Sequence, residues 1–140
     1  MTWLFDGVAD LTLAGLFGGM LFFPIIVAPR VFRVLDEDAA GRFLRDLFPG
    51  YYAYIVFTSG VAGVAMLPEG GLGPLLLFAV AGSTLVVRQA LVPRINAWRD
   101  AQRAGDEAAG RRFALGHRLS VWINGAQMLV VAALLVTRGG

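Results

Sequence analysis

Residues Leu119 to Thr137, LSVWINGAQMLVVAALLVT, form a long run without a charged side chain. An α-helix rises about 1.5 Å per residue, so about 20 apolar residues cross the roughly 30 Å hydrocarbon core of a bilayer. Three more charge-free runs of similar length fill most of the remaining chain: Leu11–Pro29, Leu47–Pro68 and Gly70–Val87. The sequence therefore predicts an all-α integral membrane protein, a four-helix bundle that forms one domain over residues 1–140.

The composition agrees with this class. Hydrophobic residues make up 57% of the chain and charged residues only 16%, whereas soluble proteins carry about 25% charged residues. The mean hydropathy is +0.67. Asp6 and Asp10 precede the first run and no basic residue does, so the run lacks the basic flank of a removable signal peptide. The absence of cysteine excludes disulfides and thiolate metal sites.

The basic residues, all twelve of them arginines, predict the orientation in the membrane. Eleven follow the first run or lie between the third and fourth runs, and only Arg138 lies elsewhere. By the positive-inside rule the eleven face the cytoplasm, so both termini lie outside and the chain forms two out-to-in hairpins. We expect spans at about 8–32, 48–67, 72–92 and 117–137, with cytoplasmic segments at about 33–47 and 93–116.

The same arginines bear on source and partners. Arginine without lysine, beside many alanines and glycines, is typical of a GC-rich bacterial genome and indicates a bacterial inner-membrane protein. Acidic residues are interleaved with the arginines, so we expect the lipid bilayer as a partner and no nucleic acid. Four short spans make a thin bundle without a spacious interior, which favours a homo-oligomer.

Turn and helix formers predict the course of the chain between the first two spans. Residues 36–46 read as a short cytoplasmic helix that begins at Asp36 or Asp38, because aspartate is a preferred N-cap. The segment LFPGYY, Leu47–Tyr52, then predicts a turn-rich aromatic connection into the second span.

Prolines predict bends within the first and third helices. We expect the first helix to be kinked or loosened at Pro24 and Pro29. The third helix is expected to continue through Pro93 into the cytoplasm as far as Arg103.

The two halves of the chain contain a short internal similarity. Ala28-Pro29-Arg30 resembles Val92-Pro93-Arg94, and Ala39–Arg42 resembles Ala108–Arg111. Because both halves are out-to-in hairpins, the similarity predicts a parallel repeat about an axis along the membrane normal.

Four polar residues mark one face of the last helix. His117, Ser120, Asn124 and Gln127 recur at steps of three, four and three residues, which places them on one helical face. Polar groups in a membrane helix face a bundle interior or a cavity rather than lipid. Two interpretations stay open: hydrogen bonds between helices, with His117 in the headgroup region, or a pocket open to the cytoplasm.

Such a pocket suits a small anionic or amphipathic ligand. Candidate lining residues from the other helices are Arg88, Arg94, Asn96, Tyr51 and Tyr52. Each also has a simpler interpretation, since arginines near a span end extend to the interface and tyrosines anchor helices there.

Catalytic constellations are sparse. No charge-free run contains a carboxylate, and the His117–Ser120 pair has no orienting acid nearby in the sequence, so we expect no catalytic residues. Weak metal candidates are His117, Met20, Met66 and Met128. Thioethers suit Cu(I) and a histidine can hold haem, but buried methionines also serve simply to fill the core.

Three patches of the chain carry a family resemblance: Ala28–Tyr52, Val92–Asn96 and Phe113–Asn124. With them the chain resembles the transmembrane-protein-205-like family, a four-span family of undetermined biochemistry. It is distantly similar to the copper-resistance-D-like membrane proteins and the HemJ type of protoporphyrinogen oxidase. The resemblance implies a four-helix bundle and supplies no catalytic residues. The haem-binding relatives are expected to use more than one histidine, whereas this chain has one.

These observations favour a small multi-pass protein that binds or transports a small molecule through the polar face of its fourth helix. The first alternative is a haem- or copper-binding redox protein centred on His117. The second is a membrane scaffold subunit without a ligand, recognised through its arginine-rich cytoplasmic face.

Overall fold

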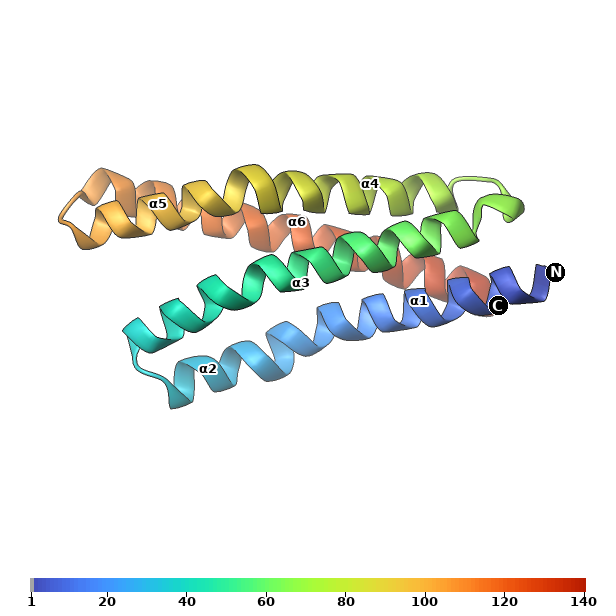
Figure 1. Cartoon of the computed structure of the whole chain (residues 1–140), viewed down its shortest axis with the longest axis horizontal. Helices are drawn as coiled ribbons and strands as arrows, with labels where there is room; N and C mark the ends of the chain where they lie inside the picture. Colours follow the sequence, from blue (N-terminus) through green and yellow to red (C-terminus); the bar gives the residue numbers. More distant parts are fainter. Residues whose placement is uncertain (1) are drawn as a thin grey trace.

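The computed structural model describes residues 2–140, and all of its regular structure is helical. Four helical segments are long and apolar enough to cross a membrane, which confirms the predicted four-helix membrane fold (Figure 1). The first comprises α1 (Thr2–Phe22), the π-helix η1 (Phe23–Val27) and α2 (Ala28–Val34). The second comprises α3 (Glu37–Ala65) and the 3-10 turn η2 (Leu67–Glu69). The third comprises α4 (Gly73–Val86), the π-helix η3 (Val87–Leu91) and α5 (Val92–Arg103), and the fourth is α6 (Glu107–Gly139).

The segments form two helical hairpins that lie side by side. Figure 1 shows both termini at one end of the bundle and the α2–α3 and α5–α6 connections at the other. Near the termini, α1 packs on α3 and α6, and α4 packs on α3 and α6. Toward the other end, α2 packs on α3 and α5 packs on α6.

The core is narrow, as four helices without a surrounding layer require. Leu13, Leu16 and Ile55 are completely buried, whereas Leu11 and Val136 are each 75% exposed. An outer surface of large apolar side chains is unfavourable in water and is the surface that a bilayer solvates. The four segments therefore make this a multi-pass membrane protein.

The prediction of a turn at Leu47–Tyr52 was wrong. These residues lie inside α3, which runs unbroken from Glu37, so the short helix predicted over 36–46 is the first part of α3. A proline inside a helix removes one backbone hydrogen bond and crowds the carbonyl four residues earlier, at a cost of about 3 kcal/mol. The aromatic residues Phe48 and Tyr51 beside Pro49 pack on Phe23 of the first helix, and these contacts favour a continuous α3. The N-cap is Asp36, whose carboxylate accepts a hydrogen bond from the amide of Ala39 at 2.8 Å.

The two hairpins correspond in detail. Each contains a five-residue π-helix, η1 or η3, directly before the Ala-Pro-Arg or Val-Pro-Arg segment. Buried residues of α1 and α4 also pair at a constant separation of 64 positions: Leu13 with Leu77, Leu16 with Val80, and Met20 with Thr84. Each long return helix begins at an aspartate that caps the amide three residues later. These correspondences are what the parallel repeat predicts.

Candidate functional site

The four polar residues of α6 lie in different environments. Gln127 and Ser120 are buried, with 6% and 9% of their surface exposed, and Asn124 is half-buried. His117 is exposed. The predicted polar face is therefore divided, with three side chains toward the bundle and one outside it.

His117 is exposed because Gly116 takes the core-facing position of its turn. A Cβ atom on Gly116 would lie 2.8 Å from the Trp98 ring, so α5 and α6 approach closely there. Neighbouring residues differ by about 100° around a helix, which turns His117 away from this contact. Its ring instead stacks on Phe113, with centroids 6.1 Å apart.

Gln127 joins α6 to α4. Its Nε2 atom donates hydrogen bonds to Ser83 Oγ at 2.8 Å and to Thr84 Oγ1 at 3.0 Å. The contact is what the structural interpretation of the polar face predicts, since hydrogen bonds between membrane helices add specificity and contribute about 0.6 to 2 kcal/mol each.

Asn124 joins α6 to α3. Tyr51 Oη donates a hydrogen bond to Asn124 Oδ1 at 3.3 Å, while the buried Asn124 Nδ2 has no hydrogen-bond partner within residues 2–140. Ser120 Oγ donates to the backbone oxygen of His117 at 2.7 Å. The serine hydroxyl is thus held by the backbone and not by the imidazole of His117.

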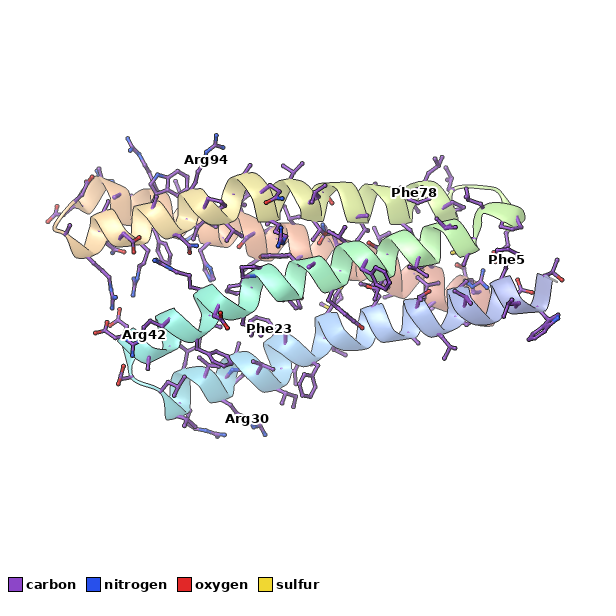
Figure 2. All side chains as sticks on the ribbon, viewed as in Figure 1. Phe5, Phe23, Arg30, Arg42, Phe78 and Arg94 are labelled. Carbon is purple, nitrogen blue, oxygen red and sulfur yellow. The ribbon has the colours of Figure 1, made fainter. Side chains whose placement is uncertain are left out.

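The arginines and Asn96 of the expected polar pocket do not meet. Arg88 is half-buried and its Nε donates to the carbonyl oxygen of Pro49 at 3.0 Å, so it turns toward α3. Arg94 is exposed on the outside of α5 (Figure 2). Asn96 is half-buried and offers its backbone oxygen to Arg45 at 3.4 Å. Of the residues that the pocket hypothesis grouped, the structure joins Tyr51 with Asn124 and directs Arg88, Arg94 and Asn96 elsewhere.

Tyr51 and Tyr52 belong to an aromatic cluster that also contains Phe23 and Phe48. The ring centroids of Phe23 and Tyr51 lie 5.0 Å apart, and those of Phe48 and Tyr52 lie 5.7 Å apart in a stacked arrangement. Tyr52 is only 6% exposed. The cluster ties η1 to α3.

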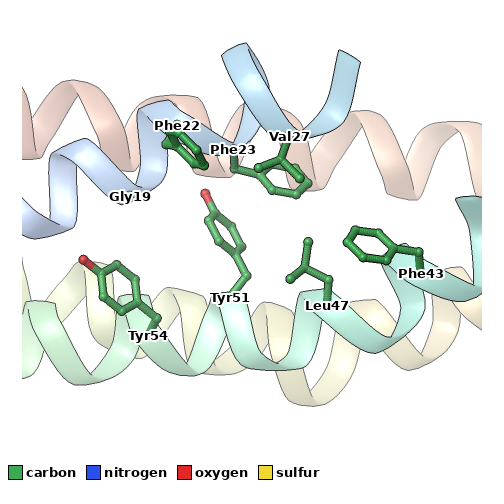
Figure 3. Close-up of a pocket in the computed structure, with 8 residues that line it drawn as sticks. All are labelled: Gly19, Phe22, Phe23, Val27, Phe43, Leu47, Tyr51 and Tyr54. Atoms are coloured by element: carbon green, nitrogen blue, oxygen red, sulfur yellow. The ribbon is translucent and has the colours of Figure 1, made fainter. Parts of the chain in front are cut away.

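A groove, here named the α1–α3 groove, runs beside this cluster and has a volume of about 330 Å³. At one end the Tyr54 ring rests on Gly19, where an added Cβ would lie 2.7 Å from the ring. Tyr54 Oη donates to the carbonyl oxygen of Gly15 at 2.6 Å. Figure 3 shows the eight lining residues: Gly19, Phe22, Phe23, Val27, Phe43, Leu47, Tyr51 and Tyr54.

The α1–α3 groove opens on the outer surface of the bundle. Phe22, Phe43 and Tyr54 are 58%, 44% and 40% exposed. Both π-helices are followed two residues later by a proline, Pro29 after η1 and Pro93 after η3, whose missing amide and ring disturb the α-helical hydrogen bonds of the preceding turn and account for the wider π-turn. π-Helical turns occur frequently at functional sites.

A smaller hollow of about 260 Å³ lies between α4 and α6. Its wall includes Ser83 and Gln127, which are joined by the hydrogen bond described above. Ser83 is related to Gly19 of the α1–α3 groove by the same separation of 64 positions. A lateral hollow thus lies on each hairpin, and the hollow on the first hairpin is the larger of these two.

The metal candidates do not converge. Met20 and Met66 are buried in the core, and Met128 is half-buried. Met66 adjoins the α3–α4 connection, where Glu69 pairs with Arg138 of α6. Arg138 therefore lies at the same end of the bundle as Met66, whereas His117 lies about 30 Å before Arg138 along α6. His117 and Met66 are thus far apart. Residues 2–140 also contain no group of three or more His, Cys, Asp or Glu side chains arranged to hold a metal ion.

Ion pairs join the hairpins outside the apolar spans. The first part of α3 pairs with α5 through Glu37–Arg99, Asp38–Arg103 and Arg45–Asp100, the last at 2.8 Å. The hydrogen bond from Arg45 lowers the pKa of Asp100 below its ordinary value. At the other end Arg138 pairs with Glu69 and with Asp10, and the hydrogen bond to Glu69 raises the pKa of Arg138.

The sequence interpretation missed the α1–α3 groove and its residues Gly19, Phe22 and Tyr54. A local indication was present, because Gly15 and Gly19 leave space on one face of a helix that Pro24 then disturbs. The ring that fills this space comes from another helix, so spacing along one helix did not identify it.

A family model described as "Domain of unknown function (DUF4149)" matches residues 11–104, from α1 to the end of α5. The chain matches no curated protein and no solved structure.

Proposed function

Since the chain belongs to the DUF4149 family, whose description assigns no activity, we propose a function from the geometry. The protein is a multi-pass membrane protein that binds a small amphipathic molecule of the bilayer in the α1–α3 groove. The observation that carries this proposal is the groove itself, with its apolar and aromatic wall and two tyrosine side chains.

The size and position of the groove suit such a ligand. Its volume of about 330 Å³ lies within the range of about 300 to 1,000 Å³ that is usual for small-molecule sites. The exposed lining side chains make it accessible from the lipid-facing surface, so a ligand reaches it by diffusion in the bilayer.

The polar face of α6 is no longer the preferred site. Gln127 bonds to α4, Ser120 bonds to its own backbone and His117 is outside the bundle. The link to the groove is Tyr51, which lines it and bonds to Asn124. In the proposal, α6 positions the tyrosine that contacts the ligand.

Orientation, assembly and transport are further parts of the proposal. Eleven of the twelve arginines lie toward the end of the bundle that carries the α2–α3 and α5–α6 connections, opposite the two termini. By the positive-inside rule, this distribution supports a cytoplasmic position for that end and an external position for both termini. We place the protein in a bacterial inner membrane on this pattern. Transport of the ligand needs a path, and four packed helices provide one most readily at the contact between copies in a homo-oligomer.

The relation to the transmembrane-protein-205-like family also stays a proposal, supported by the three sequence patches. The haem- or copper-linked alternative loses support, because His117 lies about 30 Å along the bundle from Met66 and about 16 Å along α6 from Met128. The scaffold alternative requires no groove, and the following experiment separates it from ligand binding.

The test compares two glycines of α1. Gly19→Leu blocks the groove at its Tyr54 end, because even the added Cβ would lie 2.7 Å from the Tyr54 ring and must displace it. Gly18→Leu adds the same side chain where nothing lies within 4 Å of the Cβ position. The probe is a pyrene-labelled fatty acid titrated into the detergent-purified protein and followed by fluorescence. We expect saturable binding to the wild type and Gly18→Leu, and binding weaker by about tenfold or more in Gly19→Leu.

Folding is checked by circular dichroism, and Leu47→Trp repeats the test from α3 if Gly19→Leu does not fold. Equal affinity in the groove-filling variant and the wild type would overturn the proposal, as would the absence of saturable binding.

A further inference from the structure

The cytoplasmic end of the α1–α3 groove carries arginines without acidic partners. Arg30 and Arg33 on α2 and Arg42 on α3 are exposed, and none forms an ion pair within residues 2–140. Figure 2 shows Arg30 and Arg42 near the α2–α3 connection. The other arginine on this part of α3, Arg45, is paired with Asp100.

Most acids near this end are engaged elsewhere. The Asp36 carboxylate caps α3, and Glu37 and Asp38 pair with arginines of α5. Asp46 is exposed and forms no ion pair in the described part of the chain. Three arginines therefore face one free carboxylate, which leaves this end of the groove positive.

The groove extends from this positive end into the apolar part of the bundle. Along α1 and η1 its lining runs from Val27 back to Gly19, a distance of about 12 Å from the helical rise. Arg30 follows Val27 within one turn, and its Nη1 atom donates to the carbonyl oxygen of Ile26 at 3.1 Å. The guanidinium thus lies back along η1, the element that also contributes Phe23 and Val27 to the groove.

We propose that an anionic phospholipid occupies the groove, with one acyl chain between α1 and α3 and its phosphate at Arg30, Arg33 and Arg42. The inference rests on the proposed function, for which it names the ligand class. Arginine side chains bind phosphate through paired hydrogen bonds, and basic clusters beside membrane spans attract anionic lipids of the cytoplasmic leaflet. A second copy of the chain is a poorer occupant, because it brings the same positive surface to this end.

The hollow between α4 and α6 provides an internal comparison. Within residues 2–140, neither hollow has a charged residue in its wall. The lining of this hollow ends at Ser83 on α4, about 16 Å of helical rise before the exposed Arg94, whereas the groove lining on the first helix ends at Val27, within one turn of Arg30. The nearest arginine in sequence on α4 and η3, Arg88, turns to the carbonyl of Pro49. A lipid in this second hollow therefore has no headgroup contact, and we expect one preferred anionic lipid per chain.

The experiment is native mass spectrometry of the full chain titrated with dioleoylphosphatidylglycerol or dioleoylphosphatidylcholine. We expect the wild type to bind one phosphatidylglycerol about tenfold or more tightly than phosphatidylcholine. The triple variant Arg30→Gln/Arg33→Gln/Arg42→Gln should lose this preference. The matched control neutralises three exposed, unpaired arginines of the second hairpin and should keep it: Arg94→Gln/Arg111→Gln/Arg112→Gln.

The outcomes separate the inference from the proposed function. Equal affinity for the two lipids, with both weakened by Gly19→Leu, would overturn the anionic preference and leave the groove as a binding site. An equal loss of preference in both triple variants would reduce the effect to general charge attraction. Displacement of the phospholipid by a tighter-binding oleate would identify a free fatty acid as the occupant, and a lipid-free dimer would identify a second copy. If Gly19→Leu does not weaken the binding of either lipid, the groove is not the binding site, and the proposed function is overturned.

Discussion

Gln127 shows how one side chain can be satisfied within a narrow membrane bundle. Its amide nitrogen donates to two hydroxyls of α4, and Ser83 donates onward to the carbonyl oxygen of Ala79 at 2.7 Å. Thr84 is only 1% exposed, so its oxygen has little access to any other partner. Such a contact specifies which face of α6 meets α4.

We expect Gln127→Leu to destabilise the protein by about 0.6 to 2 kcal/mol, because it removes both hydrogen bonds and leaves the Thr84 oxygen unpaired. The measurement is the free energy of unfolding in mixed detergent micelles. Thr137→Val is the control, since Thr137 is exposed and its hydroxyl bonds only to its own helix. Unchanged or increased stability in Gln127→Leu would show that the α4–α6 hydrogen bonds do not hold the helices.

At the scale of elements, the parts of α3 and α5 at the end of the bundle opposite the termini are joined mainly by charges. The three pairs between them involve side chains that remain substantially exposed, with Asp100 61% and Asp38 65% accessible. Exposed pairs are screened by salt and each contributes little, but several together orient the two rods. We therefore expect this link between the hairpins to respond to pH and ionic strength.

The Asp100–Arg45 pair has a predictable pH dependence. Its hydrogen bond lowers the pKa of Asp100 below the ordinary value of 3.8. The stabilisation is therefore complete well above pH 3.8 and is lost as the pH falls through the lowered pKa. We expect spin labels on α3 and α5 to report a broader distance distribution below that pH or in molar salt.

The control is Asp100→Asn, which removes the carboxylate and should give a broadened distribution already at neutral pH, with a smaller change on acidification. A distribution that stays narrow in this variant would show that packing rather than charge holds the two helices together.

At the scale of the molecule, the two hairpins share one plan but differ in their lateral surfaces. In both hairpins a π-helix precedes an X-Pro-Arg segment. Only the π-helix of the first hairpin contains a proline itself, Pro24, and only in the first hairpin does a tyrosine ring, that of Tyr54, lie across the groove. The first hairpin has the larger of the two hollows, and the lining of that hollow extends closer to the arginines of its hairpin. An asymmetric pair of this kind allows one half to bind while the other supports it.

The orientation of the whole molecule is open to a direct test. We expect alkaline phosphatase fused after Gly140 to be active, because this enzyme folds only outside the cytoplasm and the arginine pattern places the C-terminus there. A fusion within 104–106, between α5 and α6, should be inactive. Activity confined to the second fusion would reverse the proposed topology.

The amino-acid sequence was sufficient to predict four membrane-crossing helices. This was possible because bilayer thickness acts on each segment separately, so length and charge-free composition suffice. Asp36 as an N-cap and the helix through Pro93 to Arg103 followed from equally local rules.

Which residues contact one another depends on the tertiary structure. Helical spacing predicts that His117, Ser120, Asn124 and Gln127 share a face of α6, but it does not predict which side of that face packs against another helix. The close approach of α5 to Gly116 turns His117 out of the bundle. Pro49 stays in a helix because aromatic contacts to η1 outweigh a local tendency to turn. The α1–α3 groove depends on how far two helices diverge, and that distance is set by contacts between residues remote in sequence rather than by either helix alone.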